Sequence, residues 1–292
     1  MPIGPARMPL MDHLGELRRR LTIIVVSVLV TAVVVYEATP TLIDIFMDPL
    51  KAQLPEDFRL TVFSVLGGFT IRFKVAMFVA AIICTPIIIW EIMAFFLPAL
   101  KPNERKWVNP TVAAMVVLFY LGMAFCYFVA APAAIGWMVD QSVDFAAVIG
   151  DAEDYLNIIM LLMIGFGLAF QLPLAIFYLS VLHIVPYKKF RESWRYIYVG
   201  LMVLSSIVTP DASPVTMVLM FAALIALYEV ALAVARYVLV AKDGKESLKW
   251  TREEYEAYKE KKEEREYEES ERREEEREAA REKRLARGKG DE

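Results

Sequence analysis

Six apolar segments, separated by polar connections, dominate about the first 240 residues of the chain. A helix needs roughly 20 apolar residues, at about 1.5 Å each, to cross about 30 Å of hydrocarbon. The segments therefore predict six transmembrane helices at about residues 21–37, 75–97, 110–131, 155–181, 196–208 and 215–235. The fifth is short, and Pro86 and Pro173 lie within the second and the fourth. We expect an all-α integral membrane protein with kinked, tilted helices rather than a parallel bundle.

Positive charge marks the connections that we assign to the cytoplasmic side. Clusters of Lys and Arg occur before the first span, between the second and third, and between the fourth and fifth. The connection between the third and fourth spans holds five acidic residues and no Lys or Arg. By the positive-inside rule, both termini are cytoplasmic. We accordingly expect an amphipathic cytoplasmic segment at 1–20, a membrane domain at 21–241 and a charged cytoplasmic tail at 242–292.

The first outer connection contains a short stretch with helical periodicity. After Thr39-Pro40, apolar residues recur at Leu42, Ile43, Phe46, Met47 and Leu50. This spacing places them on one face of a helix, and Thr-Pro is a usual helix start. The pattern predicts an amphipathic helix that caps the outer face.

The N-terminal segment also has two faces. Its leucines follow a helical spacing that predicts a buried stripe: Leu10, Leu14, Leu17 and Leu21. Glu16 lies on the opposite face and has two interpretations. It either forms an exposed pair with Arg20, four residues away, or it accepts a cationic ligand.

The tail has a different composition from the rest of the chain. Residues 246–287 are almost all Glu, Lys and Arg, with opposite charges three and four residues apart. Such pairs support a solvated helix, and no apolar seam for a coiled coil is present. The tail is either a solubilising helix or a docking segment for a partner.

Composition sets the class of protein and excludes others. Hydrophobic residues make up 57% of the 292, and the formal net charge of −4 gives no reason to expect a nucleic-acid partner. Cys84 and Cys126 lie in apolar segments and are interpreted as core residues rather than a disulfide. The sequence lacks His-Glu-x-x-His, Gly-x-Ser-x-Gly and phosphate-binding loop motifs. We therefore expect no enzymatic activity, no metal site and no cofactor.

Polar side chains within the spans need partners. An amide or carboxylate in hydrocarbon is unfavourable unless it is hydrogen-bonded, paired or protonated. Gln171 lies near the middle of span four, Glu91 in span two and Glu229 in span six. We expect Gln171 to face protein or water, and Glu229 to be protonated or paired with a polar group of span four or five.

The sequence resembles the TatC family, the large multi-span subunit of the twin-arginine protein translocase. The resemblance covers about residues 9–240 and rests on motifs in the family's order. The motifs are Pro9-Leu-x-x-His-Leu-x-Glu-Leu-Arg-x-Arg20, Asp48-Pro-Leu50, Phe95-x-x-Pro-Ala-Leu-x-x-x-Glu-Arg105, Phe119-Tyr-Leu-Gly-Met-Ala-Phe-Cys-Tyr-Phe128, Phe166-Gly-Leu-Ala-Phe-Gln-Leu-Pro173, Thr209-Pro-Asp211 and Tyr228-Glu229. The set implies a six-span protein of the prokaryotic cell membrane with both ends inside.

The resemblance implies a receptor for signal peptides that carry two adjacent arginines. Glu16 and Glu104 would accept the arginine pair, and Phe95, Leu17 and Arg18 would shape the site. A guanidinium presents a planar fork that a carboxylate accepts, whereas a lysine is a point charge.

Other roles implied by the resemblance concern assembly and transport. Members of the family nucleate the assembly of small single-span subunits of the TatA and TatB type into an oligomeric membrane complex. Protein transport by this complex is driven by the protonmotive force. Gln171 and Glu229 would contact partners within the membrane, and Pro49 and Asp211 would have structural or partner contacts on the outer face.

The chain departs from the family pattern in two places. Gln171 stands where the family often has glutamate, so a proton-carrying role there is excluded while hydrogen bonding to a partner helix is retained. The run Thr209-Pro-Asp-Ala-Ser-Pro-Val215 replaces the usual sequence before span six, which weakens the expectation of partner contacts there. A small-solute carrier remains an alternative, although no internal repeat is present. An intramembrane enzyme would need a catalytic set that the sequence lacks.

Overall fold

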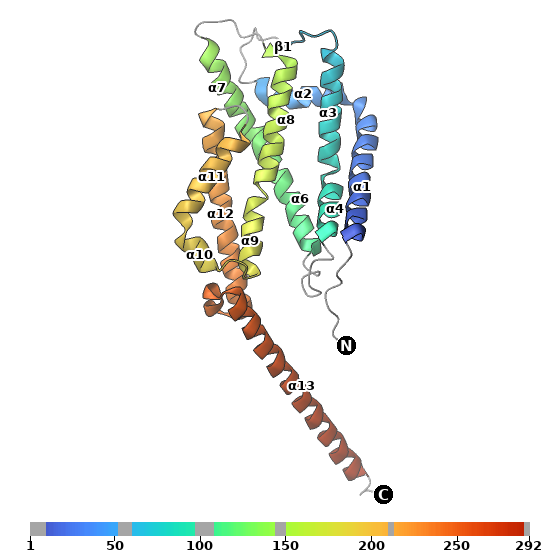
Figure 1. Ribbon diagram of the computed structural model, residues 1–292, viewed down its shortest axis with the longest axis vertical. Coiled ribbons are helices and arrows are strands. Elements are labelled where there is room, and N and C mark those ends of the chain that lie inside the picture. Colours follow the sequence, from blue (N-terminus) through green and yellow to red (C-terminus); the bar gives the residue numbers. More distant parts are fainter. Residues whose placement is uncertain (1–9, 52–59, 97–107, 144–149, 210–212, 289–292) are drawn as a thin grey trace. The chain divides into compact units, whose positions relative to one another are not determined.

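The computed structural model describes residues 10–51, 60–96, 108–143, 150–209 and 213–288 (Figure 1). The chain forms two compact units. The first comprises Met1–Ala175 with Arg195–Val230, and the second comprises Ile176–Trp194 with Ala231–Glu292.

The first unit begins with a single long helix, α1 (Leu10–Tyr36), which packs against α3 and α4. The predicted amphipathic segment and the first span are thus continuous where the structure describes them. The predicted buried leucine stripe is wrong, since Leu14 is 58% exposed, Leu17 43% and Leu21 57%. Periodicity identifies an apolar face, but no described part of the chain covers this one.

The second predicted span is a broken helix. It consists of α3 (Gly67–Ile83) and α4 (Thr85–Phe96), bent by 57° at Cys84. Pro86 has no N–H to continue the helical ladder, and the Thr85 hydroxyl donates to the Ala81 carbonyl at 3.0 Å. The helix begins at Gly67, before the predicted start of the span at residue 75, and the expected kink is confirmed.

The predicted outer amphipathic helix is present as α2 (Thr39–Lys51). Phe46 and Met47 are buried, and Phe46 contacts the ring of Phe78 with centroids 5.6 Å apart. In Figure 1, α2 runs across the direction of α1, α3 and α8 within this unit. Arg72 on α3 connects the start of α2 to the end of α1. Its side chain donates to the hydroxyl of Thr39, the first residue of α2, at 3.0 Å and lies over the ring of Tyr36, the last residue of α1.

The third span contains a π-helical turn that the sequence analysis missed. Its parts are α6 (Val108–Phe125), η2 (Cys126–Ala130) and α7 (Ala131–Val143). Pro132 lies two residues after the end of η2, and a residue without an N–H frees a carbonyl in the preceding turn, where a wider turn is accommodated. Residues Val108–Gln141 together are long and apolar enough to cross a membrane.

The fourth span is α8 (Ala152–Ala169) followed by α9 (Leu172–Val181), with the break at Phe170 and Gln171, just before Pro173. It packs closely on α6: a Cβ at Gly122 would lie 2.6 Å from the Phe166 carbonyl oxygen. Such glycines permit close approach of membrane helices. Before α8, β2 (Gly150–Asp151) pairs in parallel with β1 (Leu60–Thr61).

The last apolar helices are α11 (Trp194–Val208) and α12 (Pro214–Asp243). Four described helices are long and apolar enough to span a membrane, or five when α3 and α4 count as one span, and α11 is shorter. An all-α membrane protein is therefore confirmed, whereas the count of six spans and the cytoplasmic termini stay predictions.

The second unit contains α10 (Tyr187–Glu192), η3 (Lys245–Lys249) and the tail helix α13 (Arg252–Gly288). The expected tail helix is present, with exposed pairs four residues apart such as Lys259 and Glu263. The packing of the first turn of α13 was not predicted from the sequence. His183 is 1% exposed and stacks on Tyr255 with ring centroids 4.1 Å apart.

Both cysteines are free and buried, as expected for core residues.

Candidate functional site

Glu16 belongs to a cluster of three charged residues that joins α1 to α4. Arg20 donates through Nη2 and Nε to Glu16 Oε1, at 2.6 and 3.1 Å, and through Nη1 to Glu91 Oε2 at 2.9 Å. The three side chains are 13–22% exposed, so the pairs are partly shielded from water. The cluster holds two carboxylates and one guanidinium, which leaves one formal negative charge.

This geometry resolves part of the prediction for Glu16. The expected pair with Arg20 is present, but it is partly buried rather than exposed. No partner was predicted for Glu91, and the structure supplies Arg20. Spacing could not reveal this contact, because the two residues are 71 positions apart.

The other predicted members of the signal-peptide site are only partly described. Leu17 and Arg18 are exposed on α1. Phe95 is half-buried on α4, one helical turn after Glu91, and therefore on the same side of that helix. Glu104 lies outside the described residues. The described part of the site is thus Glu16 with its two charged partners, flanked by exposed positions of α1 and an aromatic ring on α4.

Gln171 occupies the break between α8 and α9. Its amide nitrogen donates to the Met115 carbonyl at 3.2 Å and to the Gly167 carbonyl at 3.3 Å. Its Oε1 is buried and accepts no hydrogen bond from the residues that the structure describes. The expectation that this amide faces protein is confirmed, and half of its hydrogen-bonding capacity is used.

Glu229 on α12 has the kind of partner that was expected. The Tyr198 hydroxyl on α11 donates to Glu229 Oε1 at 2.9 Å. The Tyr198 ring also meets Tyr228 edge-on, with centroids 6.0 Å apart. A hydroxyl of predicted span five thus satisfies this intramembrane carboxyl group.

On the predicted outer side, the structure adds an unpredicted cluster. Lys74 on α3 donates to Glu153 Oε1 at 2.7 Å and to Asn157 Oδ1 at 3.2 Å, both on α8. Pro49 lies in α2, and its side chain is outside the described part. Asp211 also lies outside the described residues. Their predicted outer-face roles remain predictions.

Within the described ranges, no three His, Cys, Asp or Glu side chains are placed to hold a metal ion. The charged groups form ion pairs that stabilise contacts between helices, and the cluster of Glu16, Arg20 and Glu91 carries an excess negative charge. Such an arrangement can bind a cationic ligand.

The chain is similar in sequence to a family of known proteins. Residues 12–222 match the family model described as "Sec-independent protein translocase protein (TatC)". A TatC protein of Deinococcus radiodurans is 30% identical over 79% of this chain and 87% of the relative. One from Synechocystis is 34% identical over 76% of this chain and 85% of the relative.

A solved structure, described as "Twin Arginine Translocase Receptor- TatC", aligns with a TM-score of 0.64 at 26% identity, over 77% of this chain and 98% of that one. The family consists of protein translocase components rather than enzymes, which agrees with the expected lack of catalysis. The chain is a multi-pass membrane protein that belongs to the TatC family of Sec-independent protein translocase proteins.

Proposed function

We propose that this chain is the core translocase subunit that binds twin-arginine signal peptides on the cytoplasmic side of a prokaryotic cell membrane. It nucleates assembly of small single-span subunits of the TatA and TatB type, as one of several copies in a larger complex. The complex exports folded proteins and is driven by the protonmotive force. Family membership and the described function of the solved relative support this proposal.

The observation that carries the peptide site is the Glu16–Arg20–Glu91 cluster. Glu16 already accepts two hydrogen bonds from one guanidinium, so its environment suits this group. The excess negative charge attracts a second arginine, which competes with Arg20 for Glu16 or binds a remaining carboxylate oxygen. Glu104, by its position in the family motif, supplies the second acceptor. Leu17, Arg18 and Phe95 line the approach.

Partner assembly uses the polar groups in the membrane. The buried Gln171 acceptor can take a donor from a neighbouring helix once the packing around it opens, and Glu229 with Tyr198 provides a second polar position. Pro49 and Asp211 contribute on the outer face.

The test of the receptor function measures binding of a fluorescent twin-arginine peptide to the purified full chain in detergent. The wild type is compared with the double variant Glu16→Ala/Glu104→Ala, and the peptide with a version whose arginine pair is replaced by two lysines. Glu37→Ala is the matched control, because Glu37 is an exposed carboxylate directly after the other end of α1. We expect the double variant to bind roughly a hundredfold or more weakly, since each of the two charge-assisted pairs contributes about 1.5–3 kcal/mol.

Equal binding of the arginine peptide by the wild type and the double variant would remove Glu16 and Glu104 from the site. Equal binding of the two peptides by a folded wild type would contradict an arginine-specific receptor in this subunit alone.

A further inference from the structure

A cavity of about 510 Å³ lies in the second unit, between the end of α12 and η3. Its lining is mainly apolar and includes two cations, Arg236 and Lys245. The other lining residues are Ala233, Tyr237, Val240, Ala241 and Leu248. We propose that this cavity binds an anionic phospholipid, with the headgroup phosphate on Arg236 and Lys245 and part of an acyl chain on the apolar wall.

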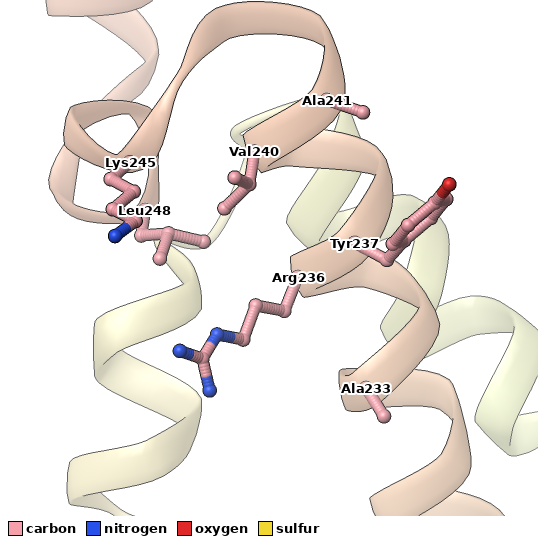
Figure 2. A pocket seen from close by; sticks show the side chains of 7 residues that line it. All are labelled: Ala233, Arg236, Tyr237, Val240, Ala241, Lys245 and Leu248. Atoms are coloured by element: carbon pink, nitrogen blue, oxygen red, sulfur yellow. The ribbon is translucent and has the colours of Figure 1, made fainter.

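The fold of the chain after α12 builds this site. Gly244 has φ of 81°, a conformation that favours glycine, and reverses the chain into η3. The turn is fixed by Ser247, whose buried hydroxyl contacts the carbonyl oxygens of Leu239 and Gly244 at 3.2 and 2.6 Å. In Figure 2 the Arg236 and Lys245 side chains extend to the same side of α12, with Val240 and Leu248 beside them.

The two cations are available to an anion. Among the described residues, neither Arg236 nor Lys245 has a hydrogen-bond or ion-pair partner. The nearby acids Asp243 and Glu246 do not line the cavity. A guanidinium and an ammonium that face one cavity provide several N–H donors for phosphate oxygens.

The position along α12 favours a lipid over a free phosphate ion. The apolar run of residues 215–235 is about 30 Å long at about 1.5 Å per residue, which matches the hydrocarbon core. Arg236 is the first cation after this run, at the level where lipid phosphates lie. Tyr237, which follows, is 77% exposed, and tyrosine is common at membrane interfaces. A free anion would need no apolar wall.

The test counts lipids retained by the full chain in neutral detergent, using native mass spectrometry with phosphatidylglycerol or phosphatidylcholine added. We expect the wild type to retain phosphatidylglycerol roughly tenfold better, and Arg236→Gln/Lys245→Gln to lose this preference, as two interfacial cations allow. Lys261→Gln/Lys262→Gln, on exposed α13, removes the same charge and keeps the preference. The charge-preserving Arg236→Lys/Lys245→Arg also keeps most of it, which separates loss of charge from loss of folding.

Two further arms identify the ligand. Ala233→Trp occupies part of the cavity while leaving both cations, and it should reduce phosphatidylglycerol retention without unfolding the chain, as checked by gel filtration. Inorganic phosphate at millimolar concentration should not displace the lipid. Equal retention of both lipids by the wild type, full retention by Arg236→Gln/Lys245→Gln, or displacement by phosphate alone would each overturn the proposal.

Discussion

Arg20 on α1 donates to Glu91 on α4 at 2.9 Å and links the two helices, although the two residues are 71 positions apart in the sequence. The same guanidinium binds Glu16, so the candidate peptide site and a helix–helix contact share one residue. Peptide binding at Glu16, as proposed above, would therefore be coupled to the stability of the α1–α4 contact.

Removing the shared cation should destabilise the protein. Arg20→Gln leaves two carboxylates of low exposure without their counterion, which costs about 1–3 kcal/mol. We expect the thermal unfolding midpoint in detergent to fall by several degrees. Arg19→Gln is the control, because Arg19 is exposed on the same turn. An unchanged midpoint for Arg20→Gln would show that the cluster contributes no net stability.

The close contact of α6 with α8 should not tolerate a larger residue. Gly122→Ala places a Cβ 2.6 Å from the Phe166 carbonyl oxygen and 2.9 Å from the Phe170 ring. We expect a loss of about 1–3 kcal/mol from the backbone shift that this overlap requires. Gly200→Ala on α11 meets no atom within 4 Å and should be neutral or stabilising. Similar unfolding midpoints for the two variants would contradict the tight packing.

The Tyr198–Glu229 hydrogen bond should be measurable by a double-mutant cycle. Tyr198→Phe removes the hydroxyl donor of Glu229 and should lower stability by about 1 kcal/mol or more. Combined with Glu229→Leu, the same change should have a smaller effect, because the acceptor has already been removed. Additive effects on the unfolding midpoint would indicate that the bond contributes nothing.

The packing of the tail should depend on pH. Burial lowers the pKa of His183, and the positive charge of Lys242 lowers it further. The Ser247 backbone and the Asp243 carboxylate act in the opposite direction and raise this pKa, but burial is the larger effect. The folded state thus prefers the neutral imidazole. Its contribution is fully present above the unfolded pKa of about 6.5 and falls as pH drops from there toward the lowered folded pKa.

Amide exchange in the first turns of α13, corrected for intrinsic rates, measures this effect. Below pH 6.5 protection should decrease in the wild type, while His183→Phe keeps a ring on Tyr255 and should show no such decrease. The same pH dependence in both proteins would assign it to other groups.

The sequence predicted those features that depend on local pattern or on membrane chemistry. The α2 cap follows from apolar spacing after Thr39-Pro40, and a polar partner for Glu229 follows from the penalty for an unpaired carboxylate. Features that need three-dimensional contacts were missed. The leucine face of α1 was correctly identified as apolar, but periodicity could not show that no described part of the chain covers it.

Two other misses share this cause. The Arg20–Glu91 pair joins distant positions, and the aromatic residues at the start of α13 looked like sparse exceptions in a charged tail. Tyr255 packs because the turn at Gly244 brings the chain back toward His183, and a single glycine gives no warning of where a chain returns.

The hydrogen bonds of Gln171 have a directional consequence. Its NH2 group already donates to Met115 and Gly167, so only an acceptor oxygen remains. A helix that docks there, after the groups that bury this oxygen have moved, must present a proton: a hydroxyl, an amide or a protonated carboxyl group fits, whereas an ionised carboxylate is repelled. A partner glutamate would therefore have to take up a proton before it could bind, and the affinity of the two helices would vary with pH although Gln171 itself never titrates.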